Sequence, residues 1–121
     1  MPALQRGDTF YYGDGGHLWV VVSDPANDGG IVLAVNITKD WFRAGSECEL
    51  FPGEHPWITC KSYVNFGDPP KFGPAQAANF AKGITSGTIR THLSVTVQLL
   101  HKIVEAGKES EALSDEMKAL L

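Results

Sequence analysis

The chain has 121 residues, of which 43% are hydrophobic and 20% are charged, and its formal net charge is −4. This length and balance fit one globular domain with a single core and exclude an intrinsically disordered chain. The acidic balance gives no general attraction to nucleic acid, so an RNA-binding role would require lysines and arginines to gather on one face.

The first half of the sequence reads as short strands separated by turns. Residues 24–30 are rich in Asp, Asn, Pro and Gly, which predicts a turn joining two apolar strands into an antiparallel hairpin. Short strands at this spacing, with no helix between them, favour a small barrel or sandwich. The predicted strands span residues 9–12, 17–23, 31–38, 47–51, 57–60 and 62–66.

The pattern changes after Asp68-Pro69-Pro70, because tandem prolines cannot donate to a strand ladder. Residues 75–82 are predicted to form a helix ending at Gly83. A longer helix is predicted over 88–106, with one apolar stripe and Gly107 as its end. The residues of that stripe are Ile89, Leu93, Val97, Leu100 and Val104.

A final short helix is expected to begin at Ser114, whose side chain can cap its free amides, with Asp115 and Glu116 in the first turn. No linker divides the chain. We therefore predict a single domain over 1–121, with a β-barrel core at 1–70 and a helical part at 71–121.

The N-terminal residues 1–8 lack the apolar core of a signal peptide, and the longest apolar runs are too short to cross a bilayer. We therefore expect a cytoplasmic protein with no membrane partner. Cys48 and Cys60 do not make a disulfide framework and are expected to be reduced.

Two histidines lie at strand ends, where loops gather into sites. His17 opens a strand directly after the glycine-rich segment 13–16, and His55 lies in the turn 52–56. Imidazole is the side chain best suited to proton transfer near neutral pH, so both are catalytic candidates. The alternative is that each only hydrogen-bonds its own loop. His92 and His101 fall off the predicted stripe and are expected on a solvated helix face.

A zinc site built from these two histidines and the two cysteines is a weaker alternative, because their spacing matches no common zinc pattern. Both cysteines are better explained as small buried side chains in strands.

Several cations and one aromatic residue fall in or beside the predicted loops. Trp41 next to Arg43 could stack on a nucleic-acid base, whereas Trp19 and Trp57 are expected to pack at the core or its rim. The alternative is an edge whose lysines block strand aggregation. The cations of this group are Lys39, Arg43, Lys61 and Lys71.

The order of these segments resembles the MazF/PemK family of toxin endoribonucleases over residues 7–66. The resemblance rests on Gly7-Asp8, the run His17-Leu18-Trp19-Val20-Val21-Val22-Ser23, the strand ending at Thr38, Glu54-His55-Pro56 and Ser62-Tyr63-Val64-Asn65-Phe66. The chain departs from the family where His17-Leu18 replaces an arginine, usually followed by proline, and where Gly67-Asp68-Pro69-Pro70 replaces a basic segment.

The resemblance implies a small SH3-like barrel of the MazF/PemK/CcdB type with two or three C-terminal helices. It also implies a homodimer, an antitoxin partner, and cleavage of single-stranded RNA without a metal or other cofactor. Metal-free cleavage needs a base, an acid and positive charge at the phosphate. We expect His17 and His55 to supply the first two, and Thr38 and Ser62 to hydrogen-bond the phosphate. The expected substrate-binding residues are Lys39, Trp41, Arg43 and Lys61.

Two other functions remain open. Small barrels also serve as non-catalytic modules that bind a protein or peptide, and the helical C-terminus could supply that surface. A toxin that acts on a protein target such as a topoisomerase is the other alternative.

Overall fold

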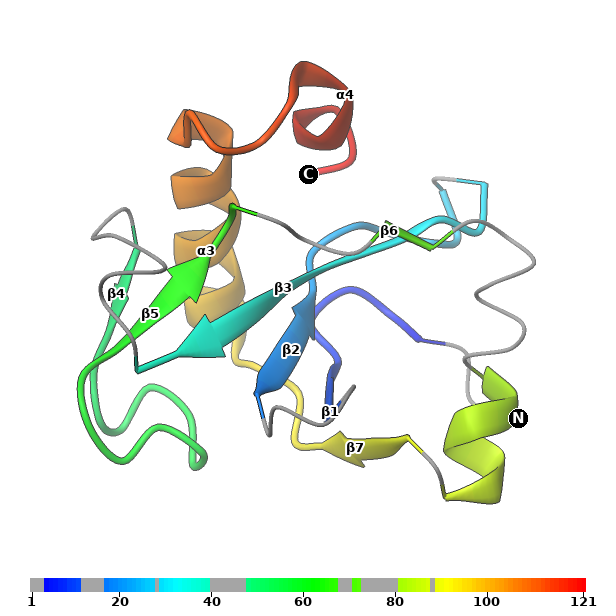
Figure 1. The fold of residues 1–121 in the computed structure, drawn as a ribbon, viewed down its shortest axis with the longest axis horizontal. Coiled ribbons are helices and arrows are strands. Elements are labelled where there is room, and N and C mark those ends of the chain that lie inside the picture. Colours follow the sequence, from blue (N-terminus) through cyan, green and yellow to red (C-terminus); the bar gives the residue numbers. More distant parts are fainter. Residues whose placement is uncertain are drawn as a thin grey trace.

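The computed structural model describes residues 4–11, 17–27, 29–39, 48–67, 71–72, 81–87 and 89–121. Within these residues the protein is mainly β, with its helices toward the C-terminus (Figure 1), which confirms the general fold class. The strands are β1 (Thr9–Tyr11), β2 (Leu18–Val21), β3 (Val32–Thr38), β4 (Glu49–Leu50), β5 (Ser62–Asn65), β6 (Lys71–Phe72) and β7 (Arg90–His92). The helices are α3 (Val97–Glu109), α4 (Asp115–Lys118) and the helical residues 81–86.

The described strands form an antiparallel sheet in the order β4-β5-β3-β2-β1-β7, and β6 pairs with the beginning of β3. The predicted hairpin of β2 and β3 is confirmed, with Leu18 opposite Ile37 and Val21 opposite Ala34. At the far end of the order, β7 pairs with β1, so a strand from late in the chain completes the sheet beside its first strand. The sheet ends at β4 on one side and at β7 on the other, so it is open.

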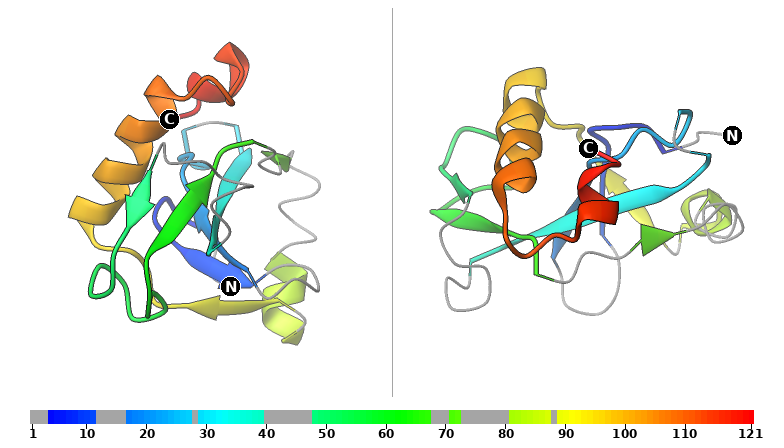
Figure 2. Two further views of the ribbon diagram at one scale, coloured as in Figure 1. Left: turned by 60° about the vertical axis from the view of Figure 1, so that its left-hand side comes forward. Right: turned by 90° about the horizontal axis from the view of Figure 1, so that it is seen from above.

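Each face of the sheet buries its own apolar cluster, because successive side chains of a strand point to opposite faces. On one face, Leu18, Val20 and Ile37 pack with Leu99 and Ile103 of α3. On the other face, Phe10, Val21, Val32 and Ala34 pack with Leu4, Trp19, Ile84 and Ile89. Figure 2 shows α3 and the helical residues 81–86 on opposite sides of the sheet.

The prediction of one helix over 88–106 is wrong. Arg90–His92 form β7, and α3 begins only after Thr96, whose hydroxyl accepts a hydrogen bond from the Leu99 amide at 3.1 Å. Residues 90–92 form a strand because all three pair with residues of β1 in an antiparallel ladder. The predicted stripe is therefore not the buried face: Leu93 is 63% exposed and Val97 is 81% exposed. The residues of α3 that are buried are Leu99, Ile103, Val104 and Gly107.

The predicted helix ends also shift. Gly107 lies inside α3, where its lack of a side chain allows close packing against Leu121, and the helix continues to Glu109. Gly83 lies within the helical residues 81–86, and the break comes at Gly87, whose φ is +83°. Residues 75–80 of that predicted helix lie outside the described residues.

Three further differences concern the β region and the final helix. Residues 57–60 were predicted to be extended, but they contain turns and no strand. β6 and β7 lie beyond residue 70, where only helices were expected. The prediction for the last helix is confirmed, because Ser114 caps α4 by accepting from the Met117 amide at 3.2 Å.

Candidate functional site

The end of the sheet near Thr38 brings together several residues that the sequence marked. Thr38 lies opposite Tyr63 of β5, and Tyr63 lies opposite Glu49 of β4. His17 comes one residue before Leu18, and Leu18 pairs with Ile37, so the antiparallel register puts His17 beside Thr38. Directly opposite residues share a face. His17, Thr38 and Tyr63 therefore form one cross-strand row.

A second row follows two residues along each strand and lies on the same face. It consists of Trp19, Asn36 and Asn65, which are opposite one another on β2, β3 and β5. The Asn65 Oδ1 atom accepts a hydrogen bond from the Gly67 amide at 2.9 Å, whereas the Asn36 Oδ1 atom is buried and has no hydrogen-bond partner. We call the two rows together the polar sheet face: His17, Trp19, Asn36, Thr38, Tyr63 and Asn65. Apart from the buried Thr38, its residues are partly exposed.

Sequence reasoning identified His17 and Thr38 on this face but missed Asn36, Tyr63 and Asn65. A signal was present, because Asn36 interrupts an apolar strand at a position that alternates with Val35 and Ile37. Trp19 was expected to pack at the core or its rim, and it does contact the cluster around Phe10.

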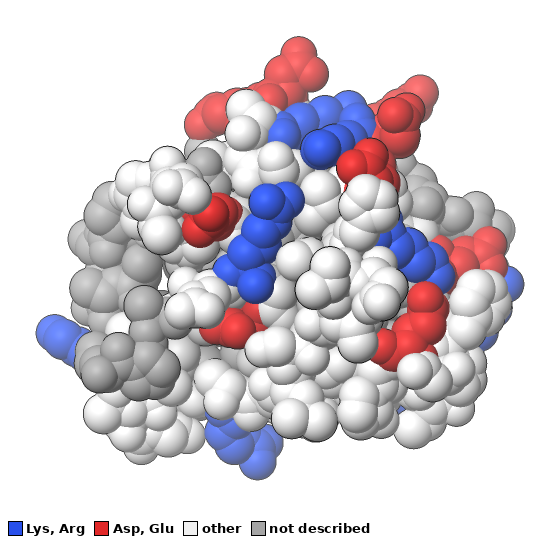
Figure 3. All heavy atoms as spheres, turned by 180° about the vertical axis from the view of Figure 1, so that it is seen from behind, with Lys and Arg blue, Asp and Glu red and all other residues white. Residues whose placement is uncertain are grey.

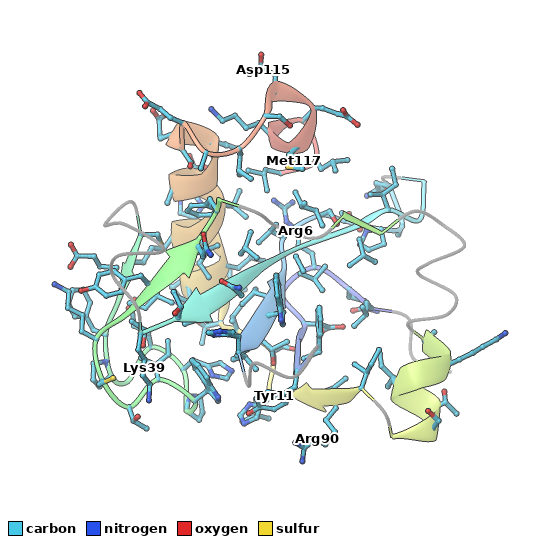
Figure 4. All side chains as sticks on the ribbon, in the orientation of Figure 1. Arg6, Tyr11, Lys39, Arg90, Asp115 and Met117 are labelled. Carbon is cyan, nitrogen blue, oxygen red and sulfur yellow. The ribbon has the colours of Figure 1, made fainter. Side chains whose placement is uncertain are left out.

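Two predicted substrate-binding lysines lie beside the polar sheet face. Lys39 directly follows Thr38 and is exposed, and Figure 4 shows it at the same end of the molecule as Tyr11 and Arg90. Lys61 Nζ lies 2.6 Å from Glu49 Oε2 and 5.8 Å from the centre of the Tyr63 ring. The hydrogen bond with Glu49 raises the pKa of Lys61, so Lys61 stays positively charged. The Glu49 carboxylate, however, already balances that charge. The other two predicted residues, Trp41 and Arg43, lie outside the described residues.

His55 is 3% exposed and both of its ring nitrogens are engaged. Its Nδ1 atom accepts from the Trp57 amide at 3.1 Å, so Nε2 carries the proton and donates to the Leu93 carbonyl at 2.7 Å. This arrangement fixes the ring orientation and leaves neither nitrogen open to a substrate. It favours the structural interpretation of His55 over the catalytic one.

Ser62 and Cys48 are also buried away from any substrate. Ser62 has no exposed surface, and its hydroxyl donates to the Cys60 carbonyl at 3.0 Å. Burial raises the pKa of Cys48 to about 11, so its thiol is protonated at neutral pH. Cys60, expected to be buried, is exposed because residues 57–60 do not form a strand. The part of the chain that the structure describes contains no group of three or more metal-ligating side chains.

The largest surprise is His92, which was expected on a solvated helix face. It ends β7, and its ring centre lies 5.2 Å from that of His55 and 6.0 Å from that of Tyr11. Its Nδ1 atom is buried and has no hydrogen-bond partner. The Arg90 guanidinium lies 5.6 Å from the centre of the Tyr11 ring. The β-branched residues Ile89 and Thr91 were the available signal for a strand here.

The charges do not form one large basic surface on the side of the molecule opposite that of Figure 1. Figure 3 shows Lys and Arg interspersed with Asp and Glu there. Any contact with RNA on that side would therefore depend on a few local cations rather than on a general basic face.

Comparisons with known proteins give no assignment: no family model matches the sequence, and no curated protein or solved structure matches it. Among the described residues, no helix is both long enough and apolar enough to cross a membrane.

Proposed function

We propose that this protein is a metal-independent endoribonuclease of the MazF/PemK type that cleaves single-stranded RNA. The observation that carries the proposal is the register of β2 and β3, which puts His17 beside Thr38 on the polar sheet face. His17 is partly exposed, so a substrate can reach it. In this proposal the protein is the toxin of a toxin–antitoxin pair and acts in the cytoplasm.

The reaction requires two proton transfers and one charged contact. His17 takes the proton from the 2′-hydroxyl, whose oxygen then bonds to phosphorus while the bond from phosphorus to the 5′-oxygen breaks. Tyr63, opposite Thr38, carries the nearest further hydroxyl of the row and gives a proton to the leaving 5′-oxygen. The exposed Lys39 supplies positive charge at the phosphate, and the buried Thr38 holds its place in the row between His17 and Tyr63. Water then attacks the cyclic phosphate and gives a proton to Tyr63, while the bond from phosphorus to the 2′-oxygen breaks and His17 returns its proton to that oxygen.

The SH3-like barrel and the homodimer of this family are part of the proposal. β3 supports the barrel, because its first residues pair with β6 and its last residues pair with β5. The His55 and Ser62 roles that the family resemblance implied are left out, because both side chains are buried and hydrogen-bonded.

The test is cleavage of a mixed single-stranded RNA with and without a chelator. We expect the wild type to cleave in both conditions and His17→Ala to lose activity by about a hundredfold or more, the usual contribution of a general base. His101→Ala is the matched control, because His101 is an exposed histidine on α3. Intact RNA with the wild type at high concentration, or full activity in His17→Ala, would overturn the proposal.

A second candidate function is a non-catalytic module that binds a protein or peptide, including a toxin directed at a topoisomerase. The exposed apolar side chains of Leu93 and Val97 favour it. Val97 also lines a groove of about 290 Å³ with Arg6, Leu100 and His101. If this function is correct, Val97→Lys abolishes partner capture while the wild type leaves RNA intact.

A further inference from the structure

The groove of about 290 Å³ lies between one face of α3 and the turn before β1 that carries Arg6. We call it the α3 groove. Its α3 residues stand at i, i+3, i+4, i+7, i+8 and i+11 counted from Val97, so they share one face of the helix over about three turns, roughly 16 Å. The apolar members are Val97, Leu100 and Val104.

The turn that carries Arg6 is held against α3 by backbone contacts. The Gly7 carbonyl accepts a hydrogen bond from the Val95 amide at 3.0 Å, and the Asp8 amide closes the turn by donating to the Gln5 carbonyl at 3.0 Å. Gly7 is buried, and a Cβ built on it would lie 3.6 Å from Leu100 Cδ2. The groove is therefore formed before any partner binds.

The base of the α3 groove exposes apolar surface to water. Val97 is 81% exposed, although it begins a helix whose inner face is buried. A single exposed apolar side chain is ordinary on a protein surface. Val97 differs because it lies beside the partly buried Leu100 in a formed groove, where a partner can remove both from water.

The rim of the α3 groove carries an excess of positive charge, although the whole chain has a net charge of −4. Arg6 and Lys108 are exposed there, and Glu105 is the one carboxylate among the described residues that line the groove. Lys108 Nζ lies 3.6 Å from Glu105 Oε1, but both side chains are about half exposed, so this ion pair is weak. A positive rim around an apolar base is complementary to a partner that combines apolar and acidic side chains.

We propose that the α3 groove binds an acidic amphipathic helix of a partner protein. Apolar side chains of that helix, three and four positions apart, contact Val97 and Leu100, as in other complexes in which a helix lies in a groove. Its Asp or Glu side chains lie beside Arg6 and Lys108. The inference goes beyond RNA cleavage and does not depend on it, because α3 packs on the sheet face opposite the one that carries Trp19.

The experiment selects binders of the full-length protein from a display library of random peptides of about 16 residues, long enough to form a helix that spans the groove. We expect the enriched peptides to carry a net negative charge and apolar residues at helical spacing. The enriched peptides are then synthesised with a fluorescent label, and their affinity is measured by anisotropy at low and high salt.

Two variants separate the apolar contact from the charge. Val97→Ser should lower peptide affinity by about fivefold or more at either salt concentration. Arg6→Glu should lower it by about threefold or more at low salt and weaken its salt dependence. Both positions are exposed, so both variants should fold. Lys82→Glu is the matched control and should change nothing, because Lys82 is an exposed lysine in the helical residues 81–86, on the other side of the sheet from α3 (Figure 2).

The proposal is overturned if no sequence is enriched, if the enriched peptides carry no excess of acidic residues, or if they bind Val97→Ser as tightly as the wild type. Displacement of the peptides by a single-stranded RNA that both variants bind more weakly would assign the groove to RNA instead. A wild-type dimer in sedimentation velocity that Val97→Ser dissociates would assign it to a second copy of the chain. RNA cleavage should be unchanged in Val97→Ser, so loss of peptide binding and loss of cleavage are distinguishable.

Discussion

Thr9 and His55 donate hydrogen bonds to the same atom, the carbonyl oxygen of Leu93, each at 2.7 Å. Thr9 belongs to the first strand, His55 to the turn after β4, and Leu93 to the segment between β7 and α3. Three parts of the chain that are distant in sequence therefore meet at one partly buried acceptor. The role of His55 follows from this position.

His55→Ala is expected to lower the free energy of unfolding by about 1–3 kcal/mol, because the partly buried Trp57 amide loses its acceptor and the Leu93 carbonyl loses one of its two donors. Urea unfolding followed by tryptophan fluorescence measures the loss. The exposed His101→Ala should change stability by less than about 0.5 kcal/mol. A fully stable His55→Ala that has lost RNA cleavage would restore the catalytic interpretation of His55.

Thr96→Ala tests where α3 begins. Loss of the cap to the Leu99 amide should cost about 1 kcal/mol, whereas Thr96→Ser should be nearly neutral. If the helix instead began near residue 88, Thr96 would lie in its exposed interior, and alanine would stabilise the protein. The sign of the change in thermal or urea stability decides between the two.

Gly107→Val should destabilise the protein by about 1–3 kcal/mol through overpacking. A Cβ at this position would lie 3.0 Å from Leu121 Cδ1 and 3.3 Å from Phe66 Cε1. Leu121→Ala in the same chain should recover part of the loss, and a double-mutant cycle by urea unfolding measures the coupling. Strictly additive effects would mean that the two residues do not meet.

The two cysteines should differ in reactivity. At mildly alkaline pH, a thiol reagent should modify the exposed Cys60 quickly and reach Cys48 only in denaturant, because burial raises the pKa of Cys48 to about 11. The absorbance of the thiolate that the reagent releases counts the cysteines modified before and after denaturant is added. Two equally fast thiols in the folded protein would contradict it.

The same pKa shift gives a pH dependence of stability. The folded-state pKa of Cys48 lies above its ordinary value of 9.0. The contribution of the protonated Cys48 thiol to the free energy of unfolding is therefore complete below about pH 9 and is lost as pH rises through about 11. Cys48→Ala should therefore lose less stability than the wild type between these two pH values. Parallel pH profiles of urea midpoints for the two proteins would contradict the shift.

The hairpin of β2 and β3 was predictable because two apolar runs flank a clear turn sequence. The cap at Ser114 was predictable because its side chain bonds an amide only three residues away. Both depend only on neighbouring residues. Whether the resemblance to MazF/PemK toxins extends to activity stays a prediction.

β7 was missed because the same residues satisfy a helical spacing, and only the distant β1 supplies the partners that make them a strand. That error also placed His92 on a solvated helix face, whereas its ring lies against those of His55 and Tyr11. The polar sheet face was only partly predicted, because the register that aligns Asn36 with Asn65 depends on pairing between strands.

The strands at both ends of the sheet are short: β4 has two residues and β7 has three. Short edge strands offer little free backbone for another chain to extend the sheet, which is one way that natural β proteins avoid edge-to-edge aggregation. If two copies associate, these two ends favour contact through side chains, as along the exposed Leu93 and Val97, rather than through a continuous intermolecular sheet.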